Sequence, residues 1–262
     1  MKSHFFAYIS RMRFIQRWAL MRNTAPENVQ EHSHQVAVLA HALAVIRNEK
    51  FGGRLDPGAV AVAALYHDAS EILTGDMPTP IKYDNPAIRN AYKDVEAVAE
   101  GKLLHMLPPE LQGVYGPILT QSDPEVRQVV KAADKLSAYI KCVEELKAGN
   151  NEFRQAAGQT RKALEGYELP EVTYFLETFM DSFSLTLDEL QTALQAQHDS
   201  LRRGLAEVHD RMANAESRKK DLEKLTRQKA QLQAQRPDQA NAVEQARTAQ
   251  ANAEKAAAEA QT

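Results

Sequence analysis

Three ionisable side chains follow an apolar, alanine-rich segment in the stretch Leu65-Tyr66-His67-Asp68-Ala69-Ser70-Glu71. We expect this stretch to lie late in a helix that begins at Asp56. At the helical period, His67 and Glu71 continue a stripe that starts at Val60, and Asp68 lies beside His67. Burying these three groups together is unfavourable unless a metal ion or hydrogen bonds compensate. The stretch therefore predicts a polar site on a helix of the core.

The His-Asp dipeptide alone carries little information, because the chain contains it three times. The other two copies, 198–199 and 209–210, lie among Gln, Arg and Lys residues, without small apolar neighbours. Context therefore distinguishes the copy at 67–68.

Outward from this stretch, apolar residues recur at intervals of three and four, and no segment alternates as a strand would. The sequence predicts an all-α protein with readable helix ends. The expected starts are Ser3, Asn28 with Glu31, Asp56 before Pro57 and Asp123 before Pro124, and the expected stops are Gly52-Gly53, Gly75 and Gly149.

Composition excludes several classes of protein. The 262 residues include 32 Lys+Arg and 35 Asp+Glu, so the chain lacks the basic excess of a protein that binds a nucleic acid polymer. No apolar run approaches the roughly 20 residues of a membrane span, and no secretion signal is recognisable. The single Cys, Cys142, lies on an apolar helix face, which favours a packing role. We expect a cytoplasmic protein that does not bind membranes.

The chain changes in character near residue 190, because the last aromatic residue is Phe183. We expect a helical domain over residues 1–190 and an Ala/Gln/Glu-rich extension over 191–262. Leucines in the extension recur at three, four and seven, with Lys219 and Lys229 interrupting the seam, as in a weak coiled coil or a long amphipathic helix. Beyond Arg236-Pro237 we expect frayed or disordered chain. A solvated extension and an oligomerisation or docking role both remain open.

Further candidate ligands lie on other predicted helices. His32 belongs to the first turn of the helix that starts near Asn28, and Asp134 is a carboxylate within an apolar, alanine-rich helix. Taken singly, each residue is more commonly a surface group or a satisfied polar residue of the core. Together with His67 and Asp68 they form a two-His, two-Asp set that suits Mn, Co, Fe, Zn or Mg.

The order His32, His67-Asp68, Asp134 resembles the H…HD…D signature of the HD-domain metal-dependent phosphohydrolases, which have a helical-bundle fold. Within that superfamily, residues 1–190 resemble the bacterial 5'-deoxynucleotidases. The segments that carry the resemblance are Ser3-His4-Phe5-Phe6-Ala7, Arg17-Trp18, Glu31-His32-Ser33, Tyr66 to Glu71, Leu73-Thr74-Gly75-Asp76-Met77-Pro78-Thr79-Pro80, Lys141-Cys142, Glu144-Glu145-Leu146 and Gly149-Asn150-Asn151-Glu152-Phe153.

The resemblance implies an enzyme that removes phosphate from deoxyribonucleoside 5'-monophosphates, works as a homodimer and selects against ribonucleotides. One divalent metal, with cobalt or manganese ahead of magnesium, zinc or iron, would bind His32, His67, Asp68 and Asp134. A bound metal would acidify water and neutralise phosphoryl charge. His32 and Asp134 would also belong to the substrate site.

The same resemblance assigns catalytic roles to Arg17, Glu71 and Asp76. Arg17 would orient the phosphate, Glu71 would orient or deprotonate the attacking water, and Asp76 would contact the water or the sugar. Trp18 would close the sugar pocket. Without the resemblance, we expect Glu71 to face solvent at the end of a helix. Asp76 would then be an ordinary turn residue after Gly75, and Trp18 would be a residue of the core.

Two regions depart from the pattern. The segment 118–124 is shorter than the corresponding segment of the family, and in the family that segment contacts the nucleotide. The extension 191–262 has no counterpart in the family. Two other functions remain open: another HD phosphohydrolase, acting on phosphodiesters or nucleoside polyphosphates, and a degenerate nucleotide-binding scaffold. His4, His34, His41 and His105 receive no role.

Overall fold

The computed structural model describes residues 2–82 and 84–259, and within these ranges it is helical, with one isolated bridge between Gln16 and Asn28 and no strand. The chain divides into two compact units, Met1–Thr186 and Leu187–Thr262. The elements of the first unit are α1 (Phe5–Ile9), η1 (Ser10–Phe14), α2 (Val29–Phe51), α3 (Pro57–Leu65), α4 (Glu71–Thr74), α5 (Thr79–Lys82), α6 (Pro86–His105), α7 (Pro109–Thr120), α8 (Pro124–Lys147), η2 (Asn151–Phe153), α9 (Arg154–Glu165), α10 (Pro170–Phe179) and η3 (Met180–Ser184).

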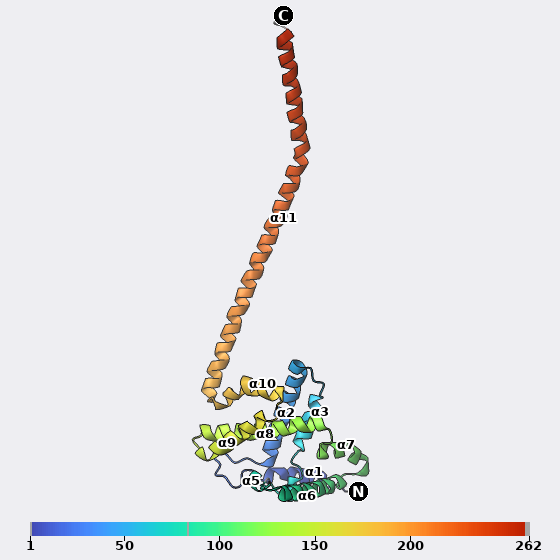
Figure 1. Ribbon diagram of the computed structural model, residues 1–262, viewed down its shortest axis with the longest axis vertical. Helices are drawn as coiled ribbons and strands as arrows, with labels where there is room; N and C mark the ends of the chain where they lie inside the picture. The colour runs from blue at the N-terminus through green and yellow to red at the C-terminus, as the bar shows by residue number, and fades with distance from the viewer. Residues whose placement is uncertain (1, 83, 260–262) are drawn as a thin grey trace. The chain divides into compact units, whose positions relative to one another are not determined.

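Helix α2 is central to the first unit and packs against α3, α8 and α10 (Figure 1). Its buried residues recur at three and four, as a helix with one covered face requires. Alanines line the contact from each side, including Ala40 on α2, Ala64 on α3 and Ala133 on α8, all fully buried. These small side chains favour close approach of the three helices, which carry or adjoin every candidate ligand.

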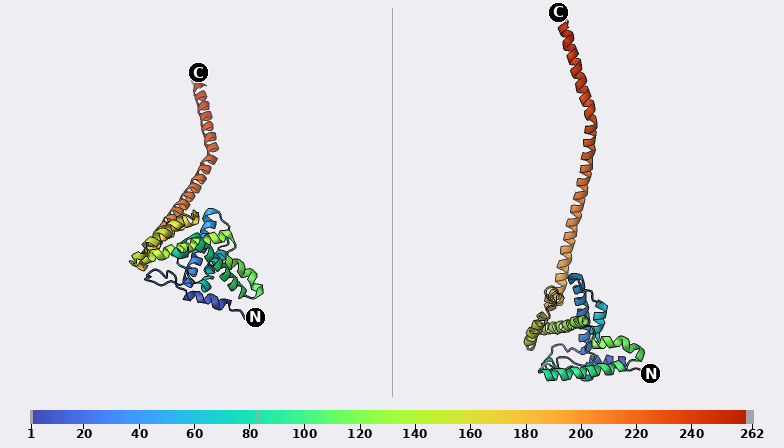
Figure 2. Two further views of the ribbon diagram at one scale, coloured as in Figure 1. Left: turned by 60° about the horizontal axis from the view of Figure 1, so that its bottom comes forward. Right: turned by 45° about the vertical axis from the view of Figure 1, so that its right-hand side comes forward.

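A second cluster of buried residues joins the N-terminal segment to α6 and α7. Phe5 is fully buried with Leu103 and Leu107, and Ala69 belongs to the same cluster. Figure 2 shows α1 and α6 on one side of this unit. The cluster therefore supports the turn that contains His67 and Asp68.

The predicted helix starts are confirmed where the capping residue directly precedes the helix. Asn28 accepts a hydrogen bond from the Glu31 backbone N–H, and Asp56 and Asp123 cap α3 and α8, each with Pro at the first helical position. Gly52 ends α2 in the left-handed conformation, with φ of 71°. Ser3 is one residue too early, because His4 directly precedes α1; the Ser3 hydroxyl instead accepts a bond from Phe5 N–H and donates one to the Met106 carbonyl.

The single helix expected from Asp56 through Glu71 is wrong. Helix α3 ends at Leu65, residues 66–70 form turns, and Glu71 begins α4. The backbone N–H groups of Tyr66 and His67 donate to carbonyls three residues back instead of four. The chain therefore leaves the α-helical hydrogen-bond pattern at this point. Adjacent residues on a regular helix point about 100° apart, so the turn is what lets His67 and Asp68 reach one point.

The second unit consists of one helix, α11 (Leu187–Glu259), which continues past Pro237 to the end of the described chain. The expectation of frayed or disordered chain beyond Arg236 therefore differs from the structure. High helix propensity of the Ala, Gln and Glu residues accounts for the helix, although it has no apolar face there. Pro237 removes one helical hydrogen bond, and Figure 1 shows a bend along α11.

Candidate active site

Four candidate ligands converge from three packed elements. His32 lies in the first turn of α2, His67 and Asp68 in the turn after α3, and Asp134 midway along α8. The His32 Nε2 atom lies 3.1 Å from Asp134 Oδ1 and 3.6 Å from Asp68 Oδ2. One ligand atom each from His32, His67 and Asp68 lies within 4.8 Å of the others, and Asp134 adjoins this cluster.

A hydrogen-bond chain behind His32 fixes its tautomer. The Ser137 hydroxyl donates to Gln35 Oε1 at 2.6 Å, so it can only accept from His32 Nδ1, which lies 3.1 Å away. Burial, followed by the charge of Arg17, lowers the pKa of His32. The Nε2 atom of His32 faces two carboxylates and lies within hydrogen-bond distance of Asp134 Oδ1.

His67 is oriented in the same way by the backbone. Its Nδ1 donates to the Ala64 carbonyl at 2.8 Å. Its buried Nε2 has no hydrogen-bond partner among the described residues, and it lies 3.0 Å from Asp68 Oδ2 outside hydrogen-bond geometry. A carbonyl bond on one ring nitrogen is the usual way in which a protein directs the other nitrogen at a metal ion.

The charges of the cluster favour a cation. Burial opposes ionisation of Asp68, but His67 and His32 lower its pKa to about 2. Burial likewise opposes ionisation of Asp134, and bonding to His32 still lowers the pKa below its usual range. Burial alone would lower the pKa of His67, whereas Asp68 and Asp134 raise it. Two carboxylates of low pKa and two imidazole nitrogens face one point, where positive charge from ring protons or from a metal ion is favourable. The donor set therefore fits a divalent metal ion.

Arg17 and Trp18 are held beside this cluster by Glu27. One carboxylate oxygen, Glu27 Oε2, accepts from Arg17 Nε at 3.0 Å and from Trp18 Nε1 at 2.9 Å. Arg17 Nη1 lies 3.4 Å from Asp68 Oδ2. The backbone N–H of Arg17 donates to the Glu27 carbonyl, which joins the two ends of the loop between these residues. The indole packs against Phe153, with ring centroids 5.3 Å apart.

Glu71 and Asp76 complete the polar site. Glu71 is buried, contrary to the alternative that placed it in solvent at the end of a helix, and its Oε2 has no hydrogen-bond partner among the described residues. Burial, followed by the charges of Asp68 and Asp76, raises the pKa of Glu71 to about 10. Burial also raises the pKa of Asp76, against the opposing charge of Arg17. Asp76 follows Gly75, whose φ of 74° permits the tight turn.

These side chains open into a cavity of about 700 Å³. That volume suits a small organic ligand. Neither His32 nor His67 lines the cavity, and none of its described lining residues comes from 118–124. The ionisable residues that line it are Arg17, Asp68, Glu71, Asp76, Lys82, Asp134, Lys135 and Glu152.

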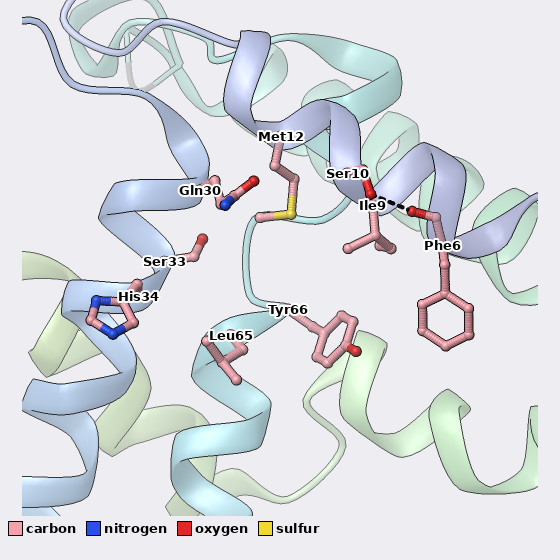
Figure 3. Close-up of a pocket in the computed structure, with 9 residues that line it drawn as sticks. All are labelled: Phe6, Ile9, Ser10, Met12, Gln30, Ser33, His34, Leu65 and Tyr66. Atoms are coloured by element: carbon pink, nitrogen blue, oxygen red, sulfur yellow. Dashed lines mark hydrogen bonds between the residues drawn. The ribbon is translucent and has the colours of Figure 1, made fainter.

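A smaller hollow of about 400 Å³ lies between the N-terminal segment and α2 (Figure 3). Its residues include His34, Met12 and Tyr66, and none of the predicted site residues lines it. Figure 3 shows these side chains spread around the hollow without a converging set of charged groups. The chemistry of the first unit is therefore concentrated in the larger cavity.

Comparison with known proteins agrees with this geometry. The family described as "5'-deoxynucleotidase YfbR-like" matches residues 4–183. The chain belongs to the YfbR-like 5'-deoxynucleotidase family. A 5'-deoxynucleotidase of Vibrio parahaemolyticus is 56% identical over 191 residues, covering 72% of this chain and 98% of the relative. A 5'-deoxynucleotidase of Yersinia pestis is 54% identical over 190 residues, covering 72% of this chain and 96% of the relative.

Solved structures agree on the fold. An HD-domain phosphohydrolase from Listeria innocua superposes with a TM-score of 0.61 at 23% identity, over 74% of this chain and 98% of that one. A protein from Pyrococcus horikoshii gives a TM-score of 0.52 at 24% identity, over 69% and 97% of the two chains. The all-α HD-domain fold predicted for this YfbR-like chain is thereby confirmed.

The structure also brings in residues that the sequence pattern did not single out. Ser137 lies three residues after Asp134 on α8, so a polar residue on the same helix face was the available signal. Glu27 lies in a loop and carried no such signal. Cys142 is buried, as expected for packing, and burial raises the pKa of its thiol to about 11.

Among the described residues, no helix combines the length and apolar character that a membrane crossing requires.

Proposed function

We propose that residues 1–190 form a catalytic domain that hydrolyses deoxyribonucleoside 5'-monophosphates to deoxynucleoside and inorganic phosphate. The observation that carries this proposal is the convergence of two oriented His side chains and two carboxylates of low pKa beside Arg17, at a cavity that accepts a small ligand. The activity named for relatives 54–56% identical supports the choice of substrate.

His32, His67, Asp68 and Asp134 would hold one divalent metal, with cobalt or manganese preferred over magnesium, zinc or iron. When bound, the metal supplies positive charge next to the phosphoryl oxygens and to the attacking water. The resemblance to the family also implies that His32 and Asp134 border the substrate phosphate, and of the two Asp134 lines the cavity. The nitrogen and hard oxygen donors support this assignment, because thiolate is absent from the set.

Arg17 orients the phosphate. Glu27 and Asp68 fix the guanidinium from two sides, and its planar set of donors matches phosphate oxygens. Glu71 orients the attacking water and accepts its proton through the buried Oε2. A metal ion bound to Asp68 would offset the negative charge of that carboxylate, which contributes to the raised pKa of Glu71. Asp76, at the rim of the same cavity, bonds to the water or to the sugar.

Trp18 discriminates between sugars. Its N–H is bonded to Glu27 and its ring rests on Phe153, so the indole cannot easily move aside for a ribose 2'-hydroxyl. An apolar pocket alone rejects an added hydroxyl by only about a hundredfold. Stronger selection requires a rigid steric contact of this kind.

The decisive experiment measures phosphate release from matched deoxyribo- and ribonucleoside 5'-monophosphates. Chelator-treated protein is assayed alone and with cobalt, manganese, magnesium or zinc. We expect metal-dependent release from the deoxy substrates and little from the ribo substrates. Equal release from both sets would reject the role of Trp18, and failure with every metal would reject the proposed activity.

The enzyme acts as a homodimer in the cytoplasm, with the extension 191–262 outside the catalytic domain. The resemblance to the family supports the dimer, and the single buried thiol is compatible with a reducing compartment. Light scattering of the full chain and of a chain that ends at residue 190 tests the first point. A monomer in both cases would contradict the dimer.

A further inference from the structure

An apolar seam runs along the first half of α11. Between residues 194 and 222, the positions that alternate at intervals of four and three, as the a and d positions of a coiled-coil heptad do, are apolar except at His198 and Lys219. The larger apolar members are 50% to 74% exposed. The d positions of the seam are Leu194, Leu201, Val208, Ala215 and Leu222, and the a positions are His198, Leu205, Met212 and Lys219.

An exposed seam of this length calls for a matching partner. It spans about 42 Å at the rise of an α-helix, and all of α11 whose side chains are described is exposed. A regular heptad repeat presents apolar residues along one line only, and another helix with the same repeat covers that line by packing knobs into holes. A flat or globular surface does not share this period.

The charges that flank the seam identify the partner as a second copy of the same helix. Arg211 and Arg218 occupy g positions, and Glu216 and Glu223 occupy the e positions five residues further on. In a parallel, in-register pair, each g residue faces the e residue of the other helix that lies five positions later. Arg211 therefore faces Glu216, and Arg218 faces Glu223, in both directions across the pair.

The remaining pairs along the seam contain no like charges. Gln197 faces Arg202, Gly204 faces His209 and Leu225 faces Ala230. An antiparallel pair centred on this stretch would instead bring g residues to g residues and e residues to e residues. It would place Arg against Arg and Glu against Glu, which is unfavourable.

We propose that α11 pairs with α11 of a second copy as a parallel, in-register, two-stranded coiled coil. The polar a positions His198 and Lys219 fit two strands, because a polar a residue specifies register and oligomer state at some loss of stability. In a two-stranded coil, the long Lys219 side chain can also extend its charged end to water. This pairing does not depend on the proposed hydrolysis.

Disulfide cross-linking in the full chain tests the pairing. Ala215→Cys places a thiol at a d position, where identical residues of a parallel pair approach within disulfide range. Ala213→Cys is the matched control, two residues away at an outer b position. Cys142 is buried and stays in place. Under mild oxidation we expect most of the Ala215→Cys chains to form covalent dimers, at least tenfold more than the control.

Two further d positions test the direction of the strands. Leu201→Cys and Leu222→Cys each cross-link with themselves in a parallel, in-register pair. Self-linking at only one of the three d positions would indicate an antiparallel pair and overturn the proposal. Equal yields at Ala215→Cys and Ala213→Cys would also overturn it, because chains brought together elsewhere would react without regard to the seam.

Charge exchange tests the choice of partner. One chain carries Arg211→Glu with Arg218→Glu, a second carries Glu216→Arg with Glu223→Arg, and both contain Ala215→Cys. Each alone should lose about tenfold in cross-linking, because its two charged g–e pairs become repulsive. An equimolar mixture should recover the cross-linking in mixed dimers. Unchanged self-linking of either chain, or no recovery on mixing, would contradict the pairing.

Discussion

The same dipeptide, His-Asp, behaves differently in the two units of the chain. His67 and Asp68 have side chains 7% and 20% exposed, and their facing atoms, Nε2 and Oδ2, lie 3.0 Å apart. His198 and Asp199 are 67% and 52% exposed, with Nδ1 and Oδ1 3.6 Å apart on the surface of α11. Burial makes the first pair a strongly interacting site, whereas water screens the second.

The difference lies in what surrounds each pair. His67 is tied to the Ala64 carbonyl, and Asp68 faces a second histidine and an arginine that come from other elements. Beside His198, no other element contributes a ligand among the described residues. A reactive dipeptide therefore needs the convergence of separate elements, and several substitutions can test this contrast.

The largest effect is expected from Asp68→Ala. Removing a carboxylate that faces both histidines and Arg17 should abolish metal binding and reduce phosphate release by on the order of a thousandfold. The matched change Asp199→Ala should leave both properties unaltered. Bound metal is measured by elemental analysis, and turnover by phosphate release. If Asp68→Ala kept its metal and activity, the site assignment would be wrong.

A second contrast compares two ion pairs of identical i,i+4 spacing. Lys141–Glu145 is buried, and Glu145 also accepts bonds from Thr24 and Asn150, whereas Arg161–Glu165 is exposed. Glu145→Gln should lower the free energy of unfolding by about 3 kcal/mol, because Lys141 then lacks its buried partner. Glu165→Gln should change it by less than about 0.5 kcal/mol. Urea unfolding measures both, and equal effects would refute the contrast.

The Glu145 contribution depends on pH. Burial opposes its ionisation, but the bonds from Lys141, Asn150 and Thr24 lower the pKa of Glu145 well below its usual range. Its stabilisation is therefore complete above the unfolded-state pKa near 4.3 and declines as the pH falls further. The difference in the free energy of unfolding between the parent and Glu145→Gln should therefore become smaller below about pH 4. A gap that stays constant would argue against this linkage.

A smaller effect is expected from Ser137→Ala. The hydroxyl fixes the His32 tautomer, so its loss should weaken metal affinity about tenfold without removing a ligand. Ser200→Ala, on the exposed face of α11, is the control and should have no effect. The metal affinity of each variant is measured by titrating metal into the protein and recording phosphate release. Unchanged affinity in Ser137→Ala would exclude the proposed orienting role.

The smallest effect is expected at the third copy of the dipeptide. His209→Ala should change neither metal content nor phosphate release, because His209 is exposed and is not among the described residues that line the cavity. A measurable loss of metal would show that the extension contributes a ligand.

The sequence predicted those parts of the fold that depend on local chemistry. Asn28, Asp56 and Asp123 cap helices because a short side chain bonds to its own backbone a few residues on, which the local pattern reveals. The turn after Leu65 could not be predicted in this way. Residues 66–69 contain neither Gly nor Pro, and the helix ends there because His67 bonds back to Ala64 while Ala69 joins the cluster around Phe5.

The candidate site divides in the same manner. His32, His67, Asp68 and Asp134 stand out as polar residues within apolar helices, and the structure brings them together, while their roles stay predictions. Glu27 reaches Arg17 and Trp18 only because its loop folds back on itself. Contacts of this kind depend on tertiary structure, and no local spacing encodes them.

The thiol of Cys142 can report on local opening of the structure beside Trp18, which lines the cavity. Cys142 is fully buried with Phe153, and Trp18 packs against the same cluster. A thiol reagent reaches this sulfur only during excursions that part these side chains, so its reaction rate follows the free energy of local unfolding rather than of global denaturation. If Trp18 contacts the nucleotide as proposed, bound nucleotide should slow the alkylation, and the Cys142 thiol would then report on occupancy of the cavity.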